Sequence, residues 1–125
     1  MEPAPHDGMP GDVLIVEDDP IIALDFEDTI LGFGVKSVRI AGTVARALEL
    51  ISDRPPEFAL LDIGLVREKT FAIAERLDAL NIPFAFVTGY SADVNLPPGL
   101  VEKPRLSKPC SRDALEAVLR RRDLG

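Results

Sequence analysis

The sequence contains a single cysteine, Cys110, a single histidine, His6, and no tryptophan. One cysteine excludes an internal disulfide and any metal cluster built from cysteines. Basic residues are also scarce, with 14 lysines and arginines against 21 aspartates and glutamates and a net charge of −7. Because a nucleic-acid-binding surface needs clustered cations to displace counterions from phosphates, this balance argues against direct nucleic-acid binding.

Long hydrophobic runs are missing as well. The longest apolar stretches, such as residues 58–61, are far too short to cross a bilayer. The chain does not open with the charged, apolar and small-residue pattern of a secretory signal. We therefore expect a soluble, cytoplasmic protein with no membrane partner. Its 125 residues, 46% of them hydrophobic, match the size and composition of one folded domain.

The order of the chain predicts an α/β domain. Residues 1–11 are rich in proline and glycine, so we expect a flexible tail before a domain over residues 12–125. Short β-prone segments then occupy residues 13–16, 37–41, 58–61, 83–87 and 105–107. Helices are expected to begin near Asp19, Thr43, Thr70 and Ser111. Strands that alternate with helices predict right-handed crossovers and a doubly wound, five-stranded parallel sheet.

Two helical segments carry further expectations. In the segment after Thr70, an apolar stripe predicts that Ile73, Ala74, Leu77 and Leu80 face inward. Residues 89–103 instead hold two prolines and no helical stripe. We expect a loop or poorly ordered structure there, so that the fourth helix of a regular α/β alternation is short or disordered.

Polar residues and one glycine follow the strands at the carboxyl edge of this predicted sheet, where ligands bind in open parallel α/β folds. They are Glu17, Asp18 and Asp19 after the first strand, Asp62 after the third, Thr88 and Gly89 after the fourth, and Lys108 after the fifth. Neighbouring carboxylates repel each other, and a hard divalent cation such as Mg²⁺ relieves that repulsion. An aspartate can also attack phosphorus, while a hydroxyl and a lysine can meet the charge of a transferring phosphoryl group.

Each of these residues also has a purely structural interpretation. An acidic pair after a strand is most often a solvated turn, and Asp19 is best interpreted as the cap of the following helix. Lys108 could simply be a loop cation before the last helix. Their joint occurrence, each at its own strand end, makes a shared site the better interpretation.

Four segments resemble the receiver domain of two-component response regulators. These segments are VLIVEDDP at residues 13–20, LDIGL at 61–65, VTG at 87–89 and SKP at 107–109. The resemblance runs from about residue 12 to 122. It implies a flavodoxin-like receiver fold in which Glu17 and Asp18 bind Mg²⁺. It further implies that Asp62 is phosphorylated and ligates the metal, that Gly64 offers its backbone carbonyl, and that Thr88 and Lys108 contact the phosphoryl group.

Residues 83–90, PFAFVTGY, are similar to the "FAT GUY" subgroup of single-domain receivers, with Val87 where that motif has alanine. Ordinary receivers often carry an aromatic switch residue on the fifth strand, and Arg105 stands at that place here. Our hypothesis is that Tyr90 or the 89–103 segment replaces the aromatic switch. Gly64 and Tyr90 stand where side chains tune hydrolysis of the aspartyl phosphate, so the resemblance does not imply a lifetime for it.

The resemblance implies a stand-alone response regulator, a signalling phosphoacceptor rather than an enzyme acting on other substrates. A sensor histidine kinase or a histidine phosphotransfer protein would dock near the first helix and the end of the fifth strand, and would phosphorylate Asp62. The signal would pass to a downstream protein target, or the domain would serve as a phosphate sink. One alternative is a non-phosphorylated pseudo-receiver that acts as an interaction module. Another is a Mg²⁺-dependent phosphatase, which usually has a second acid where Gly64 stands.

Overall fold

The computed structural model describes residues 9–62, 71–88, 104–107 and 111–120. The elements follow the order β1 (Asp12–Val16), α1 (Pro20–Gly32), β2 (Ser37–Ala41), α2 (Val44–Asp53), β3 (Phe58–Asp62), α3 (Phe71–Ala79), β4 (Phe84–Thr88), β5 (Arg105–Ser107) and α4 (Arg112–Arg120). The prediction for residues 89–103, and with it the expected state of a helix there, lies outside the described residues.

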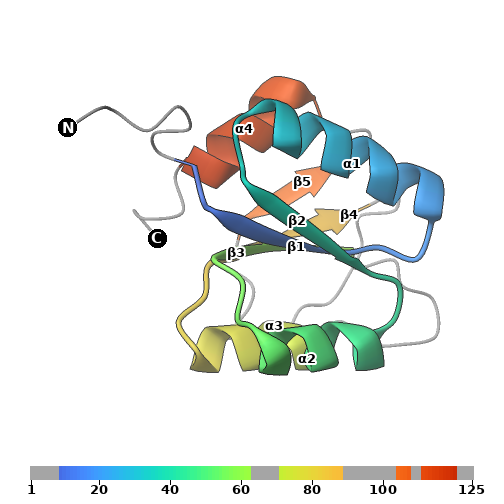
Figure 1. Cartoon of the computed structure of the whole chain (residues 1–125), viewed down its shortest axis with the longest axis vertical. Coiled ribbons are helices and arrows are strands. Elements are labelled where there is room, and N and C mark those ends of the chain that lie inside the picture. Colours follow the sequence, from blue (N-terminus) through green and yellow to red (C-terminus); the bar gives the residue numbers. More distant parts are fainter. Residues whose placement is uncertain (1–8, 63–70, 89–103, 108–110, 121–125) are drawn as a thin grey trace.

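All five strands form one parallel sheet in the order β2-β1-β3-β4-β5 (Figure 1). This arrangement confirms the predicted α/β fold and its flavodoxin-like topology. The chain runs from β1 outward to β2 and then returns to place β3 on the other side of β1. The direction of winding therefore reverses between β1 and β3, and ligands of such sheets bind at the carboxyl ends of the strands at that point.

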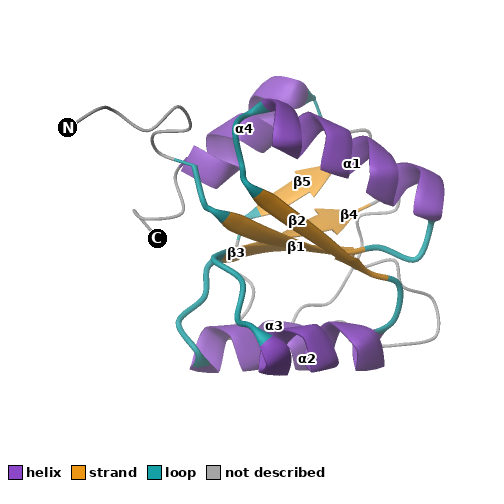
Figure 2. Cartoon of the chain, viewed as in Figure 1, coloured by secondary structure: helices purple, strands orange, loops and turns teal. Residues whose placement is uncertain are grey.

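Helices cover both faces of the sheet. Figure 2 shows α1 and α4 on one side and α2 and α3 on the other. Each side has its own apolar core, because successive residues of a strand point to opposite faces. Phe26 of α1 and Leu119 of α4 pack with Val87 of the sheet, whereas Ile51 of α2 and Leu77 of α3 pack with Phe86. The central strand β3 and its neighbour β4 are buried along their whole length.

The predicted caps begin three of the helices. Asp19 accepts hydrogen bonds from the backbone N–H groups of Ile21 and Ile22, at 2.9 and 3.3 Å, and Pro20 follows as the first residue of α1. Thr43 accepts from the N–H of Arg46 before α2, and Ser111 accepts from the N–H of Ala114 before α4. Asp19 is therefore a helix cap, as its structural interpretation predicted.

The inward face of α3 agrees with its predicted stripe except at its end. Ile73, Ala74 and Leu77 are fully buried, but Leu80 is 43% exposed. Helix α3 ends at Ala79, so Leu80 no longer follows the helical stripe. The next residue, Asn81, has a positive φ of 61°, which turns the chain back toward the sheet. The prediction that Leu80 faces inward was therefore wrong.

The chain packs against the domain from Met9 onward. The Met9 side chain is buried in the core between the sheet and α1 with α4. The N–H of Gly11 donates a 2.7 Å hydrogen bond to Oε1 of Glu57, just before β3. The last three residues of the expected tail, 9–11, thus make contacts with the domain, while residues 1–8 lie outside the described part of the chain.

Candidate functional site

Three carboxylates meet at the carboxyl ends of β1 and β3. Val16 of β1 is in register with Leu61 of β3, so the residues that follow each of them, Glu17 and Asp62, also lie beside each other. Asp18 joins them: a carboxylate oxygen from each of these three acids lies within 4.8 Å of the other two. The structure therefore brings together the acids that the sequence predicted, at the place where the winding of the sheet reverses.

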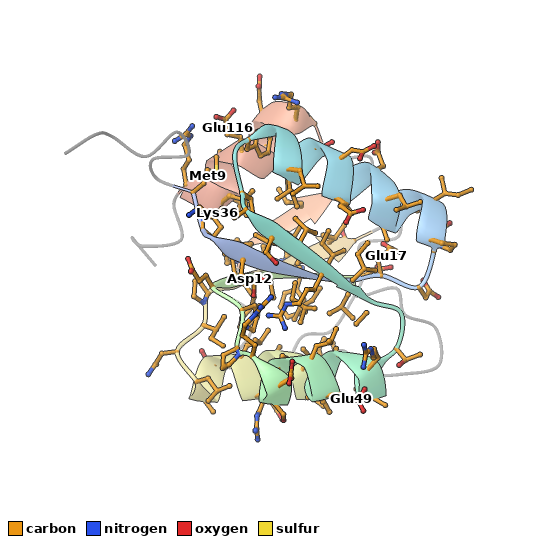
Figure 3. All side chains as sticks on the ribbon, in the orientation of Figure 1. Met9, Asp12, Glu17, Lys36, Glu49 and Glu116 are labelled. Carbon is orange, nitrogen blue, oxygen red and sulfur yellow. The ribbon has the colours of Figure 1, made fainter. Side chains whose placement is uncertain are left out.

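The three acids differ in their exposure. Glu17 and Asp62 are buried, with 3% and 4% of their surface exposed, whereas Asp18 is exposed to solvent. Oε2 of Glu17 accepts a 3.1 Å hydrogen bond from the N–H of Asp19, and its own N–H donates to the carbonyl of Ala41. Figure 3 shows Glu17 at the carboxyl end of β1, far from Asp12 at the other end of the strand. Backbone contacts with two neighbouring segments thus hold Glu17 in place.

The chemistry of this donor set matches a hard divalent cation. All three ligand groups are carboxylates, and oxygen ligands are what Mg²⁺ and Ca²⁺ prefer in proteins. Buried carboxylates this close together, such as those of Glu17 and Asp62, repel each other when both are charged. A bound cation would remove that repulsion, and the exposure of Asp18 leaves one side of the cluster open to solvent.

Thr88 ends the strand next to Asp62. It is the last residue of β4, and Val87 just before it is in register with Asp62 of β3. Its surface is only 5% exposed. On its other side Thr88 is in register with Ser107, the last residue of β5. Lys108 follows Ser107 in the sequence; Lys108, Gly64, Gly89 and Tyr90 lie outside the described residues.

The sequence patterns did not reveal two features near this site. The first is the pairing of Thr88 with Ser107, which needs the register of β4 and β5. The second is an apolar solvent-facing stripe on α1, formed by Ile21, Leu24 and Leu31. Their spacing of three and seven residues could have shown that they share a helix face distinct from the buried Phe26 and Ile30.

Comparisons with known proteins agree with this fold. No family model matches the chain. The solution structure of SdrG from Sphingomonas melonis Fr1 superposes with a TM-score of 0.77 at 36% identity, covering 90% of this chain and 95% of SdrG. The phyllosphere-induced regulator PhyR of Methylorubrum extorquens is 32% identical over 85 residues, which are 66% of this chain and 32% of PhyR. The signal receiver domain of a DNA-binding response regulator from Colwellia psychrerythraea has the same fold, with a TM-score of 0.78 at 23% identity over 91% of this chain and 98% of that domain.

The chain belongs to the response regulator receiver-domain family. It spans about a third of the length of the curated relatives it matches, 32% of one and 34% of the other, and almost the full length of SdrG. No helix in the described part of the chain combines the length and apolar character that a membrane crossing requires.

Proposed function

We propose that this chain is a single-domain response regulator in which Asp62 accepts a phosphoryl group in a Mg²⁺-dependent reaction. The observation that carries the proposal is the cluster of Glu17, Asp18 and Asp62 at the carboxyl ends of β1 and β3, with Thr88 at the end of the adjacent strand. Asp62 lies on β3, between the strand that leads to the other two acids and the strand that ends at Thr88, and this position supports its role as the reacting acid.

The reaction would be a displacement at phosphorus. An oxygen of the Asp62 carboxylate attacks the phosphorus of the donor and forms an acyl phosphate. The bond from phosphorus to the donor nitrogen or oxygen breaks, and the leaving group keeps the electron pair. Glu17, Asp18 and Asp62, together with the carbonyl that the family pattern assigns to Gly64, would hold the Mg²⁺, which when bound offsets negative charge on the phosphoryl oxygens.

The neighbouring polar groups would then contact the product. Thr88 carries a hydroxyl that can donate to a phosphoryl oxygen, and the family pattern gives Lys108 a second contact there. The chain would thus promote only its own phosphorylation and slow dephosphorylation. Phosphorylation adds a charge of about −2 at pH 7, and this change would be transmitted to a downstream protein target.

The phosphodonor would dock on α1. Of the large hydrophobic side chains exposed in the described part of the chain, three lie on this helix: Ile21 at 78%, Leu24 at 55% and Leu31 at 42%. The helix begins directly after the acidic cluster, so a partner on α1 could present a phosphorylated histidine to Asp62. A sensor histidine kinase or a histidine phosphotransfer protein would fill this role.

We also assign the chain to the "FAT GUY" subgroup on the basis of residues 83–90. Within this motif Phe84 and Phe86 pack edge to face, 5.5 Å between ring centroids, in the core on the α2 and α3 side. The arginine at position 105 is exposed on β5. An exposed cation there cannot act as a buried aromatic switch, which supports a different coupling between Thr88 and the surface.

Incubation with acetyl phosphate tests the assignment. The intact mass should rise by one phosphoryl group with Mg²⁺ and should not rise after chelation by EDTA. Asp62→Asn should abolish the mass shift, whereas Asp25→Asn, on the exposed face of α1, should label like the wild type. Labelling of Asp62→Asn at the wild-type level would refute the phosphoacceptor assignment.

The same experiment separates the alternatives. A wild-type protein that takes no phosphoryl group from any donor in the presence of Mg²⁺ would be a pseudo-receiver that works through contacts alone. Repeated hydrolysis of a phosphate ester by a small amount of protein would indicate a phosphatase instead.

A further inference from the structure

We propose that α1 presents an apolar face bordered by acids, and that the protein phosphodonor binds this face with an apolar surface bordered by lysine or arginine side chains. This inference rests on the proposed function, because it names the chemistry of the partner that phosphorylates Asp62. It goes further than that function by fixing the sign of the charge on the partner's docking surface.

The exposed side of α1 combines apolar and acidic side chains. Ile21, Leu24 and Leu31 are 78%, 55% and 42% exposed. Asp25 follows Ile21 by four positions, and it is exposed. Asp28, also exposed, follows Leu24 by four positions and precedes Leu31 by three. Residues at these spacings are neighbours on a helix surface, so both acids lie on the same face as the apolar side chains.

This face carries negative charge only. Helix α1 contains the acids Asp25, Glu27 and Asp28 and no lysine, arginine or histidine. Within the described part of the chain, neither Asp25 nor Asp28 forms an ion pair. The guanidinium of Arg112 lies over the ring of Phe33, after the end of α1. The two exposed acids therefore remain available to the charges of a partner.

The face adjoins the phosphorylation site. Ile21 lies in the first turn of α1, two residues after the cap Asp19 and three after Asp18 of the acidic cluster. A partner seated on Ile21 and Leu24 would thus stand beside Asp62, where its phosphorylated histidine has to be presented.

The charges decide between the occupants that an apolar face could have. A partner surface that is apolar throughout would cover Asp25 and Asp28 without a counter-charge, and burying an unpaired carboxylate is costly. A second copy of the chain would add further acids to the contact, and each copy has a net charge of −7. A surface with lysine or arginine around apolar anchors suits both kinds of side chain on α1.

The two acids should act mainly on the rate at which the partner associates. Exposed charges at the border of an interface steer the approach of the partner and are screened by salt, whereas buried apolar anchors prolong the contact. Phosphotransfer from the partner should therefore slow as the ionic strength rises, and Asp25 and Asp28 should account for much of this dependence.

Charge reversal tests the proposal. The double variant Asp25→Lys with Asp28→Lys is compared with Asp53→Lys with Glu75→Lys, which changes the net charge equally at exposed positions of α2 and α3. The probe is a purified histidine phosphotransfer protein with radioactive phosphate on its histidine, selected because it labels the wild-type chain. The measured quantity is the initial rate of this transfer divided by the initial rate of labelling by acetyl phosphate.

The division by the acetyl phosphate rate removes any general effect on the acceptor. We expect the ratio to fall roughly tenfold in the α1 variant at about 50 mM salt, and roughly twofold at about 500 mM, because salt screens exposed charges. In the α2 and α3 control the ratio should stay within about twofold of the wild type at either salt concentration. Thermal unfolding of both double variants verifies that they fold.

Three results would overturn the inference. An unchanged or raised ratio in the α1 variant would show that the partner does not meet these acids with basic groups. Equal losses in the two double variants would assign the effect to net charge and not to α1. A wild-type chain that dimerises in solution and becomes monomeric on Leu24→Ala would show that a second copy occupies the face.

These results differ from a failure of the proposed function. In each of them acetyl phosphate would still label the wild type at Asp62. Failure of the proposed function would instead appear as no labelling of the wild type by any donor.

Discussion

Arg39 of β2 joins the carboxylate of Asp12, at the start of β1, through both its Nε and one terminal nitrogen. The same guanidinium donates to the carbonyls of Leu50 and Arg54 at the end of α2, at 3.1 and 2.7 Å. The Arg39 side chain thus links β1 and β2 to the end of α2. This contact lies at the opposite end of the sheet from Glu17 (Figure 3).

Removal of this side chain should lower the stability of the fold. The side chains of Arg39 and Asp12 are only 15% and 13% exposed. Arg39→Ala removes the two-nitrogen partner of this largely buried carboxylate, which keeps an ion pair with Arg54 at 3.6 Å, and takes one donor from each of the carbonyls of Leu50 and Arg54. We expect the free energy of unfolding to fall by about 3 kcal/mol. Urea denaturation followed by circular dichroism measures this change. Arg39→Lys should restore little, because an ammonium cannot reproduce the fork of donors.

Arg46 provides the matched control for that experiment. It forms an ion pair with Glu49 on the outside of α2, where both side chains are more than half exposed, at 57% and 69%. Exposed pairs of this kind contribute little, so Arg46→Ala should change the free energy of unfolding by less than about 0.5 kcal/mol. Equal losses for the Arg39 and Arg46 variants would contradict the role assigned to Arg39.

Mg²⁺ should stabilise the folded chain. A ligand at 100 times its dissociation constant that binds only the native state adds about 2.7 kcal/mol to the free energy of unfolding. The cation would also relieve the repulsion between Glu17 and Asp62. Thermal unfolding with Mg²⁺ and with EDTA measures the difference. The wild type should melt at a higher temperature with Mg²⁺, and Asp18→Asn should lose most of that gain.

The control for this effect is Asp28→Asn, which removes an exposed acid of α1 away from the cluster. It should retain the full stabilisation by Mg²⁺. The proposed metal site would be wrong if Asp18→Asn responded to Mg²⁺ as strongly as the wild type does.

The exposed stripe on α1 should matter for protein phosphodonors and not for small ones. Leu24→Ala removes a side chain that is 55% exposed, so the fold should be little affected. Transfer from a phosphorylated partner protein should slow by roughly tenfold, because a truncated apolar anchor in an interface typically costs more than 1 kcal/mol. Labelling by acetyl phosphate should stay at the wild-type rate.

Leu80→Ala is the corresponding control, because Leu80 is 43% exposed and lies after α3, on the other side of the sheet. It should leave both reactions unchanged. If Leu24→Ala and Leu80→Ala slowed transfer from the partner equally, docking on α1 would be excluded.

Arg112 links α4 to α1, the two helices that cover the same face of the sheet. It is the first residue of α4, and its guanidinium lies 4.8 Å from the ring centroid of Phe33, the residue that caps the end of α1. The last turn of α1 contains no basic residue, so Arg112 supplies a cation near the negative end of that helix dipole. We expect Arg112→Ala to lower the free energy of unfolding by about 1 kcal/mol, measured by urea denaturation. Arg120→Ala, which removes an exposed pair with Glu116, should cost less.

Much of this fold could be predicted from local patterns. Continuous apolar runs identify strands that are buried on both faces, and Asp19, Thr43 and Ser111 mark helix starts because their side chains satisfy free backbone N–H groups. The alternation of strands and helices then determines a parallel sheet. Because the carboxyl ends of parallel strands share one edge, the sequence also predicted that Glu17 and Asp62 would meet there.

Other features depend on contacts between segments that are distant in the sequence. No local pattern could pair Thr88 with Ser107, since the register of β4 and β5 is set by packing of both strands. Leu80 is exposed because α3 ends at the residue before it. The helical periodicity of the sequence does not show where the helix ends. Likewise, Arg39 finds Asp12 and the end of α2 only after β2 has been placed beside β1.

The amino-acid sequence by itself thus determined the class of fold, the helix starts and the acids that form the site, because these depend on periodicity, capping and strand order. Only the tertiary structure decided which acids are buried, which hydroxyl lies next to Thr88 and which apolar side chains on α1 remain exposed. These properties depend on register and on the packing of helices against the sheet, and both are set by the whole chain at once.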